Sequence, residues 1–310
     1  MKFGAHLPLM DFGGNPFTLS HLTRFTQTAA DLGFDAVSVN DHLVFSVPWL
    51  DGPTALAAVL ERSGDMTLAT TIALGVVRGP VPLAKTLSAI DVLSGGRLVV
   101  GIGPGSSAQD YEAVGLDFAE RWPRFDEAIQ AVRALLQADE APFIGRFHST
   151  DGIDLQPRLR RSDGPPIWVG SWGSDAGMRR VARLGDGWLA SAYNTTPEIY
   201  AQACESLRAL LSAQGKDVDT FSKALATMWC YITDDRAEAE RVVRERLIKA
   251  VHRPEDVLRE RLPIGPPELF AEKLTAYARA GVEQVFIWPI ADEVHQLELF
   301  WDKVRPLVTS

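Results

Sequence analysis

The feature that most constrains this sequence is an eightfold alternation of short apolar segments with segments of helical periodicity. The apolar segments lie at residues 3–7, 36–39, 68–77, 98–102, 167–169, 188–190, 225–232 and 284–288. Each is followed by sequence whose apolar residues recur at helical spacing. Strands that alternate with helices pair in parallel through crossovers, so the order predicts an α/β fold. Eight units fit a closed (β/α)8 TIM barrel, whereas a doubly wound open sheet normally uses fewer strands.

Two longer stretches interrupt the alternation. After the fourth apolar segment comes a predicted helix near residues 125–136, and then a polar, glycine-containing stretch at 143–152 that indicates a small hairpin. After the seventh, the charged residues 235–249 indicate an exposed inserted helix. Barrels of this kind commonly hold more than about 250 residues in one unit. We therefore expect residues 1–310 to form a single barrel domain with insertions after strands 4 and 7.

Charge and composition narrow the classes of partner. The formal net charge is −9, from 40 acidic and 31 basic residues, which argues against nucleic acid because phosphate backbones select a basic face. We find no secretory signal pattern and no apolar run long enough to cross a membrane. The two cysteines, Cys204 and Cys230, do not form the paired spacing of a zinc site. We expect a cytoplasmic protein that acts on a small molecule and binds neither nucleic acid nor membrane.

Two of the segments that follow the predicted strands are rich in glycine, and this is where barrel enzymes carry their reactive groups. Residues 170–174 precede a predicted helix, so backbone amides and the helix dipole there could face a phosphate. Alternatively, Ser174 or Asp175 simply caps that helix. Residues 101–105 lack the third glycine of a dinucleotide-binding loop. They indicate either a tight turn or the close approach of a planar ring.

His42, after the second predicted strand, is the best single candidate for proton transfer. The ordinary pKa of histidine lies near neutrality, and the neighbouring Asp41 could bias it. Successive residues of a strand point to opposite faces, however, so the two side chains need not touch. A purely structural histidine fits this position as well. Three tryptophans could line an apolar pocket or serve as packing residues, namely Trp49, Trp172 and Trp288.

Three motifs in order along the chain resemble the luciferase-like oxidoreductase superfamily over nearly its whole length. The most specific runs from Pro82-Leu83-Ala84-Lys85 through Ile90-Asp91-Val92-Leu93-Ser94-Gly95-Gly96-Arg97 to Gly101-Ile102-Gly103-Pro104-Gly105. The second is Pro166-Ile167-Trp168-Val169-Gly170, followed by Asp186-Gly187-Trp188. The third is Asp41-His42. The resemblance implies a barrel that holds deazaflavin F420 or FMN across the strand ends, and it favours a homodimer.

The resemblance also implies roles for individual residues. In the F420-using branch a non-prolyl cis peptide after the third strand supports the ring, and Gly75-Val76 matches that position. Asp41 and His42 match residues beside the reactive ring carbon. The residues expected to bind the cofactor are Gly75, Val76, Gly103, Gly105, Ser106, Gln109, Gly170, Ser171, Trp172, Gly173 and Ser174, the last four at its phosphate. Ser106 stands where sugar-phosphate dehydrogenases of the branch carry a catalytic glutamate, so that activity is not expected.

The leading hypothesis is an oxidoreductase that transfers a hydride between F420 and a small organic substrate, with His42 orienting the substrate or moving a proton. The alternative is an FMN-dependent monooxygenase. A metal-dependent barrel hydrolase needs clustered histidine and carboxylate ligands at several strand ends. The first strand offers only His6, and no metal-binding residue is predicted. A non-catalytic binder with the same fold stays open, because a fold does not prove an activity.

Overall fold

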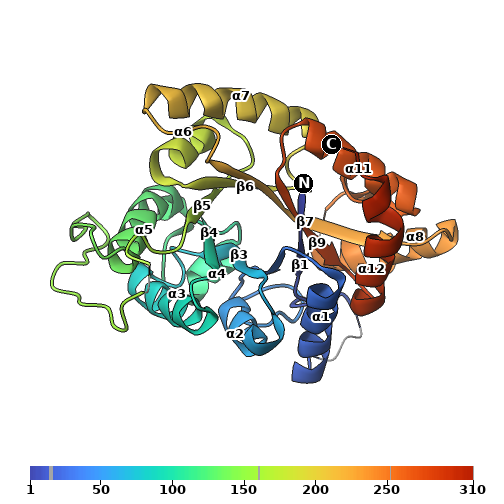
Figure 1. Ribbon diagram of the computed structural model, residues 1–310, viewed down its shortest axis with the longest axis horizontal. Helices are drawn as coiled ribbons and strands as arrows, with labels where there is room; N and C mark the ends of the chain where they lie inside the picture. The colour runs from blue at the N-terminus through green and yellow to red at the C-terminus, as the bar shows by residue number, and fades with distance from the viewer. Residues whose placement is uncertain (14–16, 160, 252, 310) are drawn as a thin grey trace.

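The computed structural model describes residues 1–13, 17–159, 161–251 and 253–309, and they form a closed parallel barrel (Figure 1). Its strands are β1 (Lys2–His6), β2 (Ala36–Val39), β3 (Thr67–Leu74), β4 (Leu98–Gly103), β5 (Ile167–Gly170), β6 (Gly187–Ser191), β7 (Ser222–Ile232), β8 (Ile264–Gly265) and β9 (Gln284–Pro289). The sheet runs β6-β5-β4-β3-β2-β1-β9-β7-β8, and β6 pairs with β7 to close it. The short β8 pairs with β7 alone, outside the cylinder. The (β/α)8 prediction is therefore confirmed.

The helices surround this cylinder (Figure 1). They are α1 (Leu19–Leu32), α2 (Gly52–Ala58), α3 (Pro80–Ser94), α4 (Ala108–Ala113), α5 (Arg121–Leu136), α6 (Asp175–Leu184), α7 (Pro197–Ala213), α8 (Arg236–Val242), α9 (Ile248–Val251), α10 (Glu255–Arg261), α11 (Pro267–Arg279) and α12 (Glu293–Leu299). Thr18 caps α1, and Gly33 ends it in the left-handed conformation that glycine adopts without steric cost. None of the helices within the described ranges has the length and apolar character that crossing a membrane requires.

The insertions lie where they were predicted, after the fourth and the seventh barrel strand. The first contains α4, α5 and the segment 137–166, in which the expected hairpin at 143–152 is reduced to one antiparallel bridge between Ile144 and Ser149. The second contains α8, a π-helical turn at Val243–Leu247, α9, α10 and β8. The third strand is shorter than expected, because residues 75–77 form a turn after Leu74. A single domain over residues 1–310 stays a prediction.

A bulge in β7 changes which side chains face the interior. The pairing of β7 with β9 shifts between Leu225 and Met228, and Thr227 has a φ of 58° at that point. Leu225 and Met228 both pack in the main core although they are three positions apart. An extra residue reverses the alternation of a strand. Trp229 therefore faces away from that core, onto Trp288, with 5.5 Å between the ring centroids.

Candidate functional site

The loops after β3, β4 and β5 converge at one end of the barrel. The Gly75 amide donates to the Gly103 carbonyl at 3.2 Å, which joins the first two. The Ile72 side chain occupies the space where Gly103 would carry a Cβ, and its Cγ2 lies 3.2 Å from the Cβ position of Gly170. Gly103 and Gly170 are therefore glycine because Ile72 packs against both backbones. These contacts bring the ends of β3, β4 and β5 together, as expected for a closed barrel.

The non-prolyl cis peptide bond is present, but its predicted position was wrong. It joins Thr71 to Ile72, inside β3, where the pairing with β4 shifts register. Gly75 is explained by packing instead, because a Cβ there would lie 2.7 Å from Cδ1 of Ile102. Val76 is buried. That Gly75 and Val76 contact a cofactor stays a prediction.

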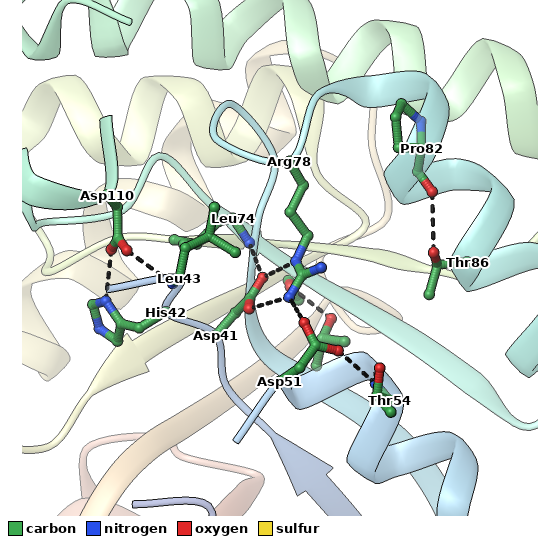
Figure 2. A network of polar contacts seen from close by, with 12 residues as sticks. Asp41, His42, Leu43, Asp51, Thr54, Leu74, Arg78, Pro82, Thr86 and Asp110 are labelled. Carbon is green, nitrogen blue, oxygen red and sulfur yellow. Dashed lines mark hydrogen bonds and ion pairs between the residues drawn. The ribbon is translucent and has the colours of Figure 1, made fainter. Parts of the chain in front are cut away.

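His42 is held by an acid that sequence reasoning did not select. Its Nδ1 lies 2.7 Å from Oδ2 of Asp110, in the first turn of α4 (Figure 2). The other carboxylate oxygen of Asp110 accepts the amides of Leu43 and Val44, each at 2.8 Å. An ionised carboxylate only accepts hydrogen bonds, so Nδ1 carries the proton of this pair. That arrangement leaves Nε2 of His42 as the nitrogen that can exchange a proton with a substrate.

Asp110 is completely buried, yet it is held in its charged form. Burial by itself would raise the pKa of its carboxyl. Hydrogen bonds and charge from His42, together with the amides of Val44 and Leu43, outweigh burial and lower that pKa below its ordinary value. The carboxylate is therefore ionised at neutral pH and can stabilise a proton on the imidazole.

Asp41 pairs with Arg78 and not with its neighbour His42. Its two oxygens accept Nε and Nη2 of Arg78 at 2.6 and 2.7 Å, and one also accepts the Leu74 amide at 3.1 Å. Arg78 in turn pairs with Asp51, which caps α2 (Figure 2). Asp41 thus ties the end of β2 to the end of β3, and it is Asp110 that neighbours the imidazole. A catalytic role for Asp41 stays a prediction.

The segment expected at the cofactor phosphate leads into the N-terminus of α6. Ser174 caps this helix, with its Oγ accepting the Gly177 amide at 3.2 Å. Ser171 Oγ accepts the Gly173 amide at 3.3 Å, and the Trp172 side chain is about half exposed. The capping interpretation of Ser174 is thus confirmed. The remaining amides of the first turn have no acceptor within the helix, which is the arrangement that binds anions at helix N-termini.

The other residues expected at the cofactor lie on the loop between β4 and α4 and in α4 itself. Ser106 and Gln109 are exposed there, and Gly105 has a φ of 84°, which favours glycine. Gln109 directly precedes Asp110 in the chain. The contacts of Gly105, Ser106 and Gln109 with a cofactor stay predictions, as does phosphate binding by residues 170–174.

Aromatic side chains gather at the ends of β1 and β9 and on the loop after β2. His6 stacks on Trp288 with 3.7 Å between ring centroids. Burial lowers the pKa of His6 to about 3, although the Leu7 carbonyl and the Asn40 side chain act in the other direction, so His6 is neutral. Trp49 lies 5.8 Å from Trp288 and 4.8 Å from the His42 ring.

The predicted tryptophans therefore divide between two places. Trp49 and Trp288 come together, whereas Trp172 lies on the loop after β5. Trp229 was missed, because its direction depends on the β7 bulge, which has no sequence signal that we recognise. Among the described residues, histidine, cysteine and acidic side chains form no group of three or more that could hold a metal ion.

Comparisons with known proteins give a family match and F420-dependent relatives. The family model described as luciferase-like monooxygenase matches residues 2–257. An F420-dependent hydroxymycolic acid dehydrogenase of Mycobacterium tuberculosis is 28% identical over 72% of this chain, which spans 62% of that relative's length. An F420-dependent glucose-6-phosphate dehydrogenase of Nakamurella multipartita is 25% identical, with 99% of this chain and 96% of the relative aligned.

Solved structures share the fold. An F420-dependent secondary alcohol dehydrogenase in complex with an F420-acetone adduct superposes with a TM-score of 0.84 at 18% identity, covering 100% of this chain and 99% of the other. The FMN-bound oxygenating constituent of 3,6-diketocamphane monooxygenase from Pseudomonas putida gives 0.75 at 17% identity, with 100% and 99% covered. At these identities the likeness establishes the architecture alone.

Proposed function

Because this chain belongs to the luciferase-like monooxygenase family, we propose that it is an oxidoreductase that transfers a hydride between F420 and a small organic substrate. The observation that carries the proposal is the pair formed by the buried Asp110 and the partly buried His42, in the segments that follow the C-terminal ends of β4 and β2. In a barrel of this kind that end is where chemistry takes place. The F420 dependence of the two relatives supports the choice of cofactor.

The chain's own residues fit a planar ring at this position. Gly103 and Gly170 let Ile72 pack directly on the ends of β4 and β5, and the flat ring lies against this Ile72 surface on our proposal. On this proposal the ring is held by the backbone and side chains of Gly75, Val76, Gly103, Gly105, Ser106 and Gln109, and its phosphate by residues 170–174. When bound, F420 supplies the two-electron chemistry.

His42 handles the proton that accompanies the hydride. When the substrate is an alcohol, Nε2 accepts the hydroxyl proton while the hydride leaves the carbon; in the reverse direction the same nitrogen returns the proton to a carbonyl oxygen. Asp110 fixes the tautomer and stabilises the imidazolium, so Asp110 is a positioning residue. Asp41 supports the site indirectly through Arg78 and the end of β3.

Glucose 6-phosphate is not the substrate that this site supports. The residue that argues against it is Ser106, which offers a hydroxyl where the resemblance implies a catalytic carboxyl in sugar-phosphate dehydrogenases. A serine cannot act as a general acid or base near neutral pH unless another group activates it. We therefore propose that this chain acts on a different substrate from its relative, the glucose-6-phosphate dehydrogenase.

The second candidate is an FMN-dependent monooxygenase, which the description of the matching family favours. Titrating the cofactor-free protein with F420 and with FMN separates the two, and we expect F420 to bind at least about tenfold more tightly, or by about 1.4 kcal/mol. Tighter binding of FMN would reverse the order. Light scattering on the same sample tests the homodimer, which we also propose.

A further inference from the structure

We propose that Trp229, Trp288 and Trp49 form an indole wall that recognises an uncharged substrate with a flat apolar body and a carbonyl-type acceptor oxygen. The inference deepens the function proposed above and rests on it for the location of the substrate. It assigns a substrate class and the residues that select it.

The first observation is a set of unpaired donors. The indole nitrogens of Trp49, Trp229 and Trp288 are buried, and within the described ranges none has a hydrogen-bond partner. An indole N–H is a donor only, and buried indoles normally find an acceptor. Buried polar atoms without a partner are few in folded proteins, so three of one kind in one cluster require an explanation.

The second observation is that the three donors are contiguous and close to the proton-transfer residue. Ring centroids of Trp229 and Trp288 are 5.5 Å apart, those of Trp49 and Trp288 are 5.8 Å apart, and Trp49 lies 4.8 Å from the His42 ring. A ligand oxygen placed here would satisfy donors that the protein leaves open and lie beside His42.

The third observation is the backbone that places Trp229. Thr227 has a φ of 58°, and for a β-branched residue this conformation is a genuine outlier that persists only where the surrounding structure enforces it. Without the bulge, Trp229 would face the main core together with Leu225. The strained position therefore serves to bring an indole to the barrel end.

The chemistry around the wall selects against charge. Phe12 and Tyr193 pack on Trp229, and Phe45 packs on Trp49. In the part of the chain that is described, no arginine or lysine stacks on the three indoles. Arg253 lies over Tyr193 at 5.5 Å, and Arg261 donates to the Tyr193 carbonyl. A phosphate held against the three indoles would lose its hydration, and the two arginines of this region contact Tyr193 and not the indoles, so its binding there is unfavourable.

The test uses two probes that differ by one oxygen. 1-Indanone and indane share a flat bicyclic body, and only the former has an acceptor; glucose 6-phosphate is the charged comparison. Each is titrated calorimetrically into F420-saturated wild type, Trp229→Phe, Trp288→Phe and, as matched control, Trp301→Phe. Trp301 packs on Phe34, between α1 and β2, far from the wall. Thermal unfolding and F420 affinity are measured for every variant.

We expect wild type and Trp301→Phe to bind 1-indanone about tenfold more tightly than indane, and the preference to fall to about twofold in at least one of the two wall variants. Equal binding of the two probes by wild type, no binding of 1-indanone, or tighter binding of glucose 6-phosphate would overturn the proposal. The proposal would also be overturned if the wall variants bind F420 more weakly than wild type but still prefer 1-indanone to indane.

A failure of the proposed function would give a different result from a failure of the indole wall. If wild type binds no F420, the cofactor assignment is wrong, and the titrations are made on the protein without cofactor. A preference for 1-indanone that disappears in the wall variants would then still support the indole wall.

Discussion

Nδ1 of His42 and Oδ2 of Asp110 lie 2.7 Å apart although their residues are 68 positions apart in the chain. The contact joins the loop after β2 to the helix after β4. The same carboxylate accepts two amides from residues 43 and 44, so it also fixes the loop that carries the imidazole. One buried acid therefore sets the position and the tautomer of His42 (Figure 2).

Asp110→Asn should lower turnover by about 100-fold or more, the range in which a positioned general base contributes. The asparagine keeps the size of the side chain, but its amide can donate to Nδ1 and so move the imidazole proton to Nε2. Steady-state kinetics over pH with F420 measure the effect. The matched control is Glu112→Gln, an exposed acid on the same helix, with activity within about twofold of wild type. Equal pH profiles for Asp110→Asn and wild type would contradict the role.

The architecture could be predicted because strand and helix periods are local properties of the sequence. The eight apolar segments and both insertions were found in this way. The end of β3 was misplaced because the apolar run continues through the turn at residues 75–77. Local periodicity cannot distinguish a buried turn from a buried strand.

The site could be predicted only as far as strand ends define it. His42 was found from its place after a strand, but Asp110 was missed because its burial and its pairing depend on a contact between distant segments. Trp229 was missed because one inserted residue reverses the facing of a strand, and nothing in the composition of β7 marks where the insertion lies.

Arg78 should be essential for stability in a way that lysine cannot replace. Arg78→Met leaves the buried Asp41 without its partner and should lower the free energy of unfolding by about 3–5 kcal/mol. Arg78→Lys should recover only part of this, because an ammonium cannot make the bidentate contact. Urea unfolding measures both. Arg236→Lys, in an exposed pair with Glu240, should change stability by less than about 0.5 kcal/mol. Full recovery by lysine would show that the fork geometry is unimportant.

His6 should make the protein less stable in acid. The unfolded chain protonates this residue below pH 6.5, whereas the folded state keeps it neutral to about pH 3. The unfolded state thus binds more protons between these values, and the free energy of unfolding falls as pH falls, by about 1.4 kcal/mol per unit. His6→Gln should remove that part of the slope, measured by urea unfolding from about pH 7 to about pH 5. His295→Gln, at an exposed histidine, should keep the slope. A wild-type slope in His6→Gln would refute the assignment.

Two glycines of β4 should be destabilised by alanine to different extents. A Cβ at Gly101 would overlap the carbonyl oxygen of Thr70, part of the backbone of β3, whereas a Cβ at Gly103 would overlap the mobile end of the Ile72 side chain. Gly101→Ala should therefore lower the free energy of unfolding by more than about 3 kcal/mol, and Gly103→Ala by about 1–2 kcal/mol.

Gly103→Ala, the less destabilised of the two variants, should lose more affinity for F420 than Gly101→Ala. Because the new methyl group at residue 103 moves Ile72 at the barrel end, Gly103→Ala should weaken F420 binding by about tenfold while the fold persists. The fraction of Gly101→Ala that folds should bind F420 as wild type does, since its Cβ lies against Thr70 and Leu189, below the strand ends. Calorimetric titration with thermal unfolding on the same samples separates the two effects. Unchanged F420 affinity in a folded Gly103→Ala would mean that the cofactor does not lie against Ile72.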